Sequence, residues 1–143
     1  MLVGMIALVL GAAFCGAALY IQVAEHPARM MLDDRNALAQ WGPSYARAFN
    51  LQGGLAVASG LAGIVAAFLM RDLTWTLGAL LMLANWPFTV WGILPLNNRL
   101  KAIPPDSAGR ESRAMLDRWI WLHAVRTGLS GLAVLAYLWA AAS

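Results

Sequence analysis

Four long stretches that are uncharged or nearly uncharged dominate this chain of 143 residues. They cover residues 2–24, 48–70, 73–98 and 119–143, and Arg126 in the last stretch is the one charged side chain that they contain. A bilayer core about 30 Å thick needs about 20 apolar residues in a helix, so each stretch is long enough to cross a membrane. The sequence therefore predicts four transmembrane helices.

The composition of the chain agrees with a membrane protein and argues against a nucleic-acid partner. Hydrophobic residues make up 61% and charged residues 12%, against about 45–50% and about 25% in soluble domains. The net charge of +3 comes from basic residues that are spread over loops without a basic run, which favours membrane orientation over polyanion binding. We expect the lipid bilayer as a partner and no nucleic acid; the oligomeric state stays open.

One domain accommodates all four helices. We expect an all-α, integral membrane four-helix bundle over residues 1–143, with spans at about 2–24, 45–70, 73–95 and 119–141. The Glu25-His26-Pro27 step is expected to close the first span, because proline cannot donate to the helix ladder. Residues 71–72 form a hairpin turn, and longer connections cover about 27–44 (loop 1) and 96–118 (loop 3). In an up-down-up-down bundle, loops 1 and 3 lie on the same side.

The basic residues predict the orientation of the bundle in the membrane. Loop 1 and its junction carry three of them, loop 3 carries five, and the opposite face carries only Arg71 besides the amino terminus. By the positive-inside rule, both loops are expected in the cytoplasm and both termini outside.

Polar residues inside the spans gather at the ends nearest loops 1 and 3, where four helix ends meet. We therefore predict one polar pocket in that half of the membrane. Its members are Gln22, Glu25 and His26 of the first span, Tyr45 and Gln52 of the second, Asn85 and Thr89 of the third, and His123 and Arg126 of the fourth.

Arg126 is the deepest of these charges. It follows Trp119 by seven residues, about 10 Å along the helix, and an arginine near the centre of a span costs roughly 2.5–3.5 kcal/mol. We expect its side chain to face inward and to pair with Glu25, the one carboxylate within reach. The alternative is a guanidinium that extends to the lipid headgroups from a slightly shifted helix.

The two histidines, His26 and His123, lie at loop-side span ends and can approach one another. A neutral histidine beside a carboxylate can act as a general base near neutral pH. Together with Glu25 the pair could instead bind a metal, and two facing histidines could ligate haem. Interfacial histidines that hydrogen bond to their neighbours are a third possibility.

The seven tryptophans divide into two groups by position. Near span ends, Trp41, Trp75, Trp119 and Trp139 are expected to anchor the helices at headgroup level. Within the spans, Trp86, Trp91 and Trp121 are candidates for lining the site of a flat aromatic ligand, although packing also explains each of them.

Four segments of the chain carry a resemblance to a known family. They are VAEHPAR (23–29), WGPSYAR (41–47) followed by Gln52, NWPFT (85–89) with PLNN (95–98), and WLHAVR (121–126). As a set, they resemble motifs of a small four-span membrane family of largely unknown function that includes the anthrone oxygenases. The resemblance implies oxidation of an electron-rich phenolic carbon by dioxygen, as in anthrone to anthraquinone, without an obvious cofactor.

A mechanism consistent with this resemblance places the polar pocket at the centre. In this hypothesis His123 or His26 deprotonates the substrate, Arg126 with Asn85 stabilises the resulting enolate, and Glu25 completes the catalytic cluster. The residues expected to bind a small hydrophobic aromatic substrate are Tyr45, Gln52, Trp86, Thr89 and Trp121.

Two other functions stay open at this point. One is a membrane redox protein that holds haem or copper through His26 and His123. The cofactor is unknown at this point: none is favoured, and haem or copper is the alternative. The other is a non-catalytic membrane subunit whose polar cluster only fixes helix packing.

Overall fold

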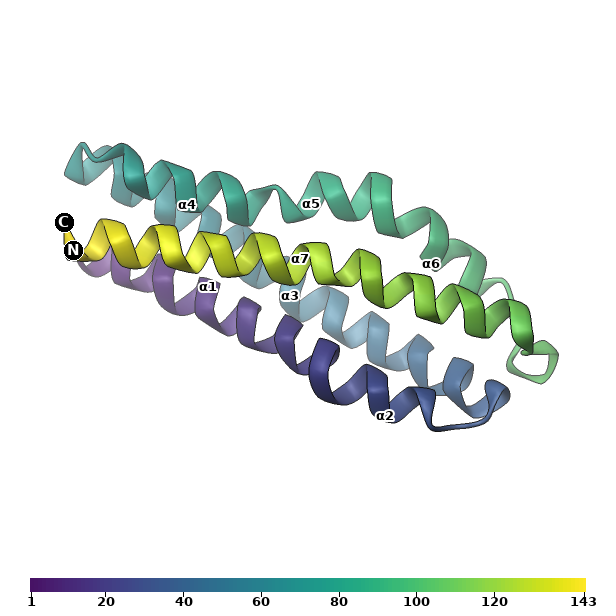
Figure 1. The fold of residues 1–143 in the computed structure, drawn as a ribbon. Coiled ribbons are helices and arrows are strands. Elements are labelled where there is room, and N and C mark those ends of the chain that lie inside the picture. Colours follow the sequence, from purple (N-terminus) through teal and green to yellow (C-terminus); the bar gives the residue numbers. More distant parts are fainter.

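Four long antiparallel helices make up the protein in a computed structural model that describes residues 1–143 (Figure 1). The chain contains no strand, so the prediction of an all-α four-helix bundle is confirmed. The first helix consists of α1 (Leu2–Tyr20), the π turn η1 (Ile21–Glu25) and α2 (His26–Met30), and the second helix is α3 (Asp34–Met70). The third helix consists of α4 (Leu73–Leu83), α5 (Asn85–Phe88), the π turn η2 (Thr89–Ile93) and α6 (Leu94–Lys101). A short 3-10 turn, η3 (Pro105–Ser107), leads to the fourth helix, α7 (Arg110–Ala142).

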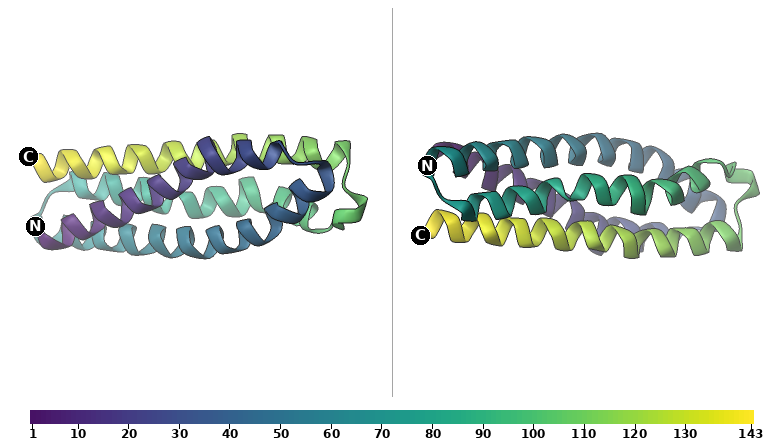
Figure 2. Two further views of the ribbon diagram at one scale, coloured as in Figure 1. Left: turned by 90° about the horizontal axis from the view of Figure 1, so that it is seen from below. Right: turned by 90° about the horizontal axis from the view of Figure 1, so that it is seen from above.

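The helices alternate in direction, so both termini and the α3–α4 turn lie at one end of the bundle (Figure 2). Helix α1 packs against α3 and α7, and α4 packs against the same two helices. The α3–α4 turn is closed by Arg71, which has a φ of 54° in the left-handed region, and by Asp72, which accepts a hydrogen bond from the Thr74 N–H at 2.9 Å. Loops 1 and 3 share the opposite end. We call the two ends of the bundle the termini half and the loop half.

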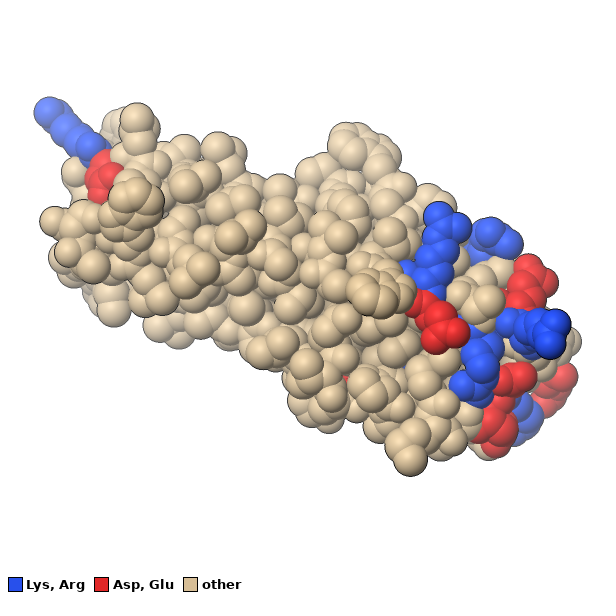
Figure 3. All heavy atoms as spheres, viewed as in Figure 1, with Lys and Arg blue, Asp and Glu red and all other residues tan.

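A wide belt without charged side chains surrounds the middle of the bundle. On the face seen in Figure 3, Lys, Arg, Asp and Glu gather at one end, and a small charged group marks the other end. All four helices are long and apolar enough to cross a membrane. These findings support an integral membrane protein with four spans.

Loops 1 and 3 are shorter than the sequence predicts, because the helices continue past the expected ends. Loop 1 comprises only residues 31–33, and loop 3 comprises residues 102–109. The expectation that Pro27 ends the first helix is wrong. In η1 the His26 N–H bonds to the Ile21 carbonyl, five residues back, and Pro27 then stands in the first turn of α2, where a missing N–H is tolerated. Pro95 follows η2 in the same arrangement.

Three tryptophans that were expected at headgroup level are buried instead. Trp75 packs against Tyr137 in the termini half, with ring centroids 5.8 Å apart. Trp41 and Trp119 meet edge to face at 6.3 Å in the core of the loop half. Because the helices extend beyond the predicted spans, the core also extends to positions that the sequence places at the membrane surface. Trp139 is exposed.

Candidate functional site

Arg126 faces the interior of the bundle from the middle of α7 and is 7% exposed. Its Nη2 donates to Oε1 of Gln52 on α3 at 3.0 Å, and its Nε has no partner. The guanidinium carbon lies 5.4 Å from the centre of the Phe14 ring. The expected pairing of Arg126 with Glu25 is wrong, because no carboxylate forms an ion pair with this arginine. The buried guanidinium is therefore hydrogen bonded to a neutral amide and not to a carboxylate.

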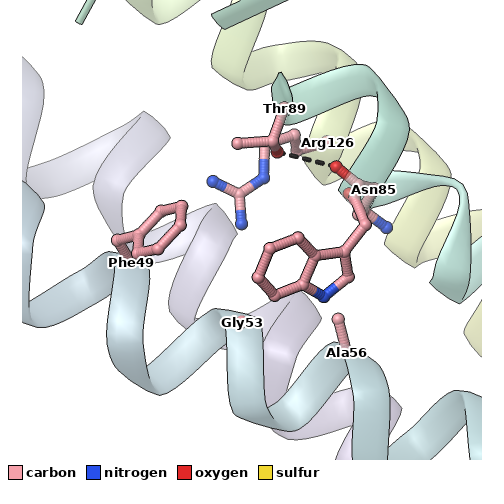
Figure 4. A pocket seen from close by; sticks show the side chains of 7 residues that line it. Phe49, Gly53, Ala56, Asn85, Thr89 and Arg126 are labelled. Atoms are coloured by element: carbon pink, nitrogen blue, oxygen red, sulfur yellow. Dashed lines mark hydrogen bonds between the residues drawn. The ribbon is translucent and has the colours of Figure 1, made fainter. Parts of the chain in front are cut away.

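A small cavity lies beside Arg126, between α3 and α5 (Figure 4). Its volume of about 10 Å³ leaves room for about one water molecule. Figure 4 shows the Arg126 guanidinium pointing toward Phe49, with Gly53 and Ala56 on the α3 side. Trp86 also lines the cavity and is 37% exposed. The cavity thus reaches the outer surface of the bundle within the uncharged belt.

Asn85 is the first residue of α5 and directly follows the interruption of the third helix at Ala84. Its Nδ2 donates to the Met82 carbonyl at 3.0 Å, and the Thr89 hydroxyl donates to the Asn85 carbonyl at 2.7 Å. These bonds hold the backbone around Pro87, which has no N–H of its own. The Asn85 side chain is buried, lines the cavity and has an unpaired Oδ1. Two residues that line this cavity, Arg126 and Asn85, therefore each have an unpaired polar group: the Nε–H of Arg126 and the Oδ1 of Asn85.

Both histidines lie inside the loop half and stack on the same indole, that of Trp119. The ring centroids are 5.8 Å apart for His26 and 5.0 Å apart for His123. Both imidazoles are buried, so neither side chain faces outward from the bundle. Neither ring nitrogen of His123 has a partner, nor does Nε2 of His26. His123 precedes Arg126 by three residues, so the stacked rings lie one helical turn from the buried cation.

Glu25 belongs to a polar network with Arg29 at the loop end of the bundle. Nη2 of Arg29 lies 2.6 Å from Oε1 of Glu25, one helical turn away. The Ser44 hydroxyl donates to the same carboxylate, and Nε of Arg29 donates to the side-chain oxygen of Gln40. Arg29 is a near neighbour of Glu25 on the same helix, which explains why Glu25 pairs with it rather than with Arg126.

The aromatic residues predicted to bind substrate separate in the structure. Tyr45 faces inward from α3 and stacks on Trp41, with ring centroids 5.1 Å apart. Trp121 is 76% exposed and Trp91 is 79% exposed, so neither lines the internal cavity. Trp121 lies midway between Trp119 and His123 in sequence, and both of these point inward, so the helical turn directs Trp121 outward.

The acidic and histidine side chains do not form a three-ligand metal site. No group of three His, Cys, Asp or Glu side chains is placed to hold a metal ion. A site made of Glu25, His26 and His123 is therefore not supported, because Glu25 is engaged by Arg29 and Ser44. Ligation of haem or copper would have to rest on the two histidines alone.

Arg29 and Trp119 are central to this site, although the sequence placed them in a loop and at the headgroup layer. Spacing offered a signal for both. Arg29 follows His26 by three residues, and Trp119 precedes His123 by four, which are neighbouring positions on one helix face. Asn97 is buried with neither amide atom paired; its signals were a polar side chain in an apolar stretch and its place in the PLNN segment (95–98).

Comparison with known protein families gives one match. The family described as Anthrone oxygenase matches residues 41–136, about two thirds of the chain. The matched segment includes Asn85, His123 and Arg126 but not Glu25 or His26. No curated protein and no solved structure gives a significant match.

Proposed function

The chain belongs to the anthrone oxygenase family, and on that premise we propose that it oxidises a phenolic or polycyclic aromatic substrate with dioxygen beside Arg126. For anthrone, a base removes one methylene proton and leaves an enolate. The carbanion reduces dioxygen, a C–O bond forms, and the resulting peroxide anion takes the proton back from the base to give a hydroperoxide. Loss of water then leaves a carbonyl group, so anthrone and one O2 give anthraquinone and one H2O.

A buried cation without a carboxylate partner is the observation that carries this proposal. Arg126 donates only to neutral Gln52, and its Nε–H has no acceptor. An unpaired charge inside a helix bundle is costly, and an enolate or phenolate oxygen beside Nε would neutralise it. A donor aimed at the place where negative charge develops also lowers the barrier of the reaction.

The walls of the cavity suit a planar ring. Phe49 and Trp86 lie edge to face with centroids 5.9 Å apart, and Asn85 Oδ1 is free to accept a hydrogen bond from a phenol O–H. The present volume is too small for a polycyclic ring, so binding requires an outward turn of the Trp86 side chain. Since Trp86 is exposed within the uncharged belt, a hydrophobic substrate reaches the cavity from the bilayer.

The remaining residues of the site support this chemistry. A buried histidine one turn from Arg126 supplies the base. Gln52 orients the Arg126 guanidinium, and Thr89 holds the Asn85 backbone. Tyr45 extends the aromatic wall toward the loop half through its stack on Trp41, and Glu25 neutralises Arg29 at the loop end.

We place loops 1 and 3 in the cytoplasm and both termini outside. The Arg29 side chain is buried inside the bundle, so seven of the eight basic residues counted at this end remain at the surface. The other end has only Arg71 besides the amino terminus. That bias favours the same orientation. Labelling of a Ser107→Cys variant in intact cells tests it, because a membrane-impermeant reagent should reach this loop 3 position only after the cells are opened.

Turnover by the purified protein tests the proposed oxidation. The protein in phosphatidylcholine vesicles is given anthrone, and we expect one O2 consumed for each anthraquinone formed, measured with an oxygen electrode and by absorbance. Absence of turnover would contradict the substrate class and favour the non-catalytic role. A Soret band or stoichiometric copper in the active protein would contradict direct reduction of dioxygen by the carbanion and favour the haem or copper alternative.

A further inference from the structure

The hydrogen bonds of Arg29 determine which nitrogen of His26 carries the proton. Arg29 is 2% exposed, and its Nη1 lies 3.3 Å from Nδ1 of His26. A guanidinium only donates, so Nδ1 of His26 must accept this hydrogen bond. A doubly protonated imidazolium has no accepting nitrogen. The His26 ring is therefore neutral and carries its hydrogen on Nε2.

We propose that Arg29 is a positioning residue that holds His26 as a hydrogen-bond donor, and that His123 is the base. In this tautomer His26 has no free lone pair, because Nδ1 is engaged by Arg29 and Nε2 bears the hydrogen. Nε2 is buried without a protein partner, so its N–H is free to donate to an oxygen of the bound substrate. This division of roles rests on the proposed oxidation, whereas the tautomer of His26 does not.

His123 has the free lone pair that His26 lacks. Both of its ring nitrogens are buried and unpartnered, so either neutral tautomer leaves one nitrogen able to accept a proton from the substrate. Trp119 stacks on both rings, and its indole N–H also lacks an acceptor. His26 and Trp119 thus offer two neighbouring donors, which suits an oxygen that gains negative charge.

Arg29 is held in place by three other side chains. Its Nη2 donates to Glu25 at 2.6 Å and to the Ser44 hydroxyl at 3.2 Å, and its Nε donates to Gln40. The carboxylate neutralises the guanidinium, and the neutral partners from α3 fix its plane. The network therefore directs Nη1 at His26 as a fixed donor.

The tautomer can be measured directly, because the chain contains only two histidines. The full-length protein, labelled with 15N-histidine, is reconstituted in phosphatidylcholine vesicles, and solid-state NMR distinguishes protonated from unprotonated ring nitrogens. The His26→Gln and His123→Gln variants assign the signals. We expect His26 to be protonated at Nε2 alone. Protonation at Nδ1, or at both nitrogens, would overturn the proposal.

Variants of Arg29 separate positioning from packing. Lysine also only donates, so Arg29→Lys should retain the Nε2–H form of His26. Glutamine can accept, so Arg29→Gln should shift part of the His26 population to Nδ1–H. Arg113→Gln is the matched control, because Arg113 bonds to Asp34 and to the Leu32 carbonyl at the same end of the bundle. An unchanged tautomer in Arg29→Gln would contradict the role of Arg29.

Anthrone turnover is measured in a separate experiment from the His26 tautomer. We expect kcat to fall in Arg29→Gln and to recover in Arg29→Lys, with little change in KM. If wild-type His26 has the expected tautomer but anthrone is not oxidised, the proposed function fails and the positioning by Arg29 stands. If anthrone is oxidised and the tautomer differs, the assignment of donor and base is wrong.

Discussion

The two halves of the bundle differ in whether their buried polar side chains have hydrogen-bond partners. In the termini half, the Tyr137 hydroxyl donates to the Ser59 carbonyl at 3.1 Å, and the Ser59 hydroxyl donates to the Ala7 carbonyl at 2.8 Å. The buried side-chain atoms without a protein partner lie in the loop half or near its border with the termini half. They belong to Gln22, His26, Trp41, Asn85, Asn97, Trp119, His123 and Arg126.

The two halves also differ in their backbones: the helices are regular in the termini half and contain π turns in the loop half. In the termini half, regular helices approach closely, and a Cβ on Gly63 or Gly78 would overlap the Tyr137 ring. The loop half contains both π turns, η1 and η2. Buried unpaired polar atoms and π turns are both typical of functional sites. The termini half is thus built for close packing, and the loop half contains the unpaired polar groups on which the proposed reaction depends.

Replacement of the base should have the largest effect on the loop half. We expect His123→Gln to lower the rate of anthrone oxidation by roughly 10²–10⁴-fold, the usual contribution of a general base. The melting temperature should change little, because His123 makes no side-chain hydrogen bond. His26→Gln is the comparison and should lose less, since His26 is not the base and the glutamine amide N–H can still donate a hydrogen bond. A larger loss in His26→Gln than in His123→Gln would reverse the assignment.

Removal of the buried cation should slow the reaction and stabilise the fold. Arg126→Gln is expected to lower the rate by about 10²-fold, as for loss of one oxyanion donor. The melting temperature should rise, because a buried charge without an opposite charge is removed. Arg118→Gln, an exposed position on the same helix, serves as control. A lower melting temperature in Arg126→Gln would show that this cation stabilises the bundle.

A packing substitution should affect the termini half alone. We expect Gly78→Ala to destabilise the protein by about 1–3 kcal/mol, because the added methyl group overlaps the Tyr137 ring. The oxidation rate of the folded protein should stay the same. Gly131→Ala on α7 is the control, since nothing lies within 4 Å of the added Cβ. Thermal unfolding in detergent measures both, and equal stabilities would remove the distinction between the halves.

Widening the cavity should change which substrates fit. We expect Trp86→Ala to increase the oxidation rate of a four-ring phenolic substrate relative to anthrone by up to about tenfold. Trp91→Ala is the control, because Trp91 is exposed but does not line the cavity. The same change of preference in Trp91→Ala would argue against access between α3 and α5.

The smallest expected effect lies at the start of α3, outside the membrane. The pKa of Asp33 is lowered by hydrogen bonds from the backbone N–H and the side-chain amide of Asn36. Its stabilising contribution is therefore present above the ordinary Asp pKa of about 3.9 and is lost as the pH falls through the lowered value. Asp33→Asn can still cap the helix but cannot titrate, so we expect its melting temperature to lack this small decrease in acid. A decrease equal to that of the wild type would contradict the assignment.

Much of the fold could be predicted, because each uncharged stretch has one favourable solution in a bilayer, a helix with its backbone groups satisfied. The four helices, their alternation and the common side of loops 1 and 3 followed from this. Helix ends were less predictable. Pro27 and Pro95 normally end helices, and only the π turns before them allow each helix to continue.

The residues of the candidate site could be predicted better than the partners with which they form hydrogen bonds. Polar residues in apolar spans identified Asn85, His123 and Arg126, because such groups avoid lipid. Sequence alone could not decide that Arg126 would bond to Gln52 while Glu25 bonded to Arg29. Hydropathy depends on composition along one helix, and that was enough for the spans and for the inward orientation of Arg126. The choice of partner depends on the rotation and axial offset of neighbouring helices, which only their packing in three dimensions sets.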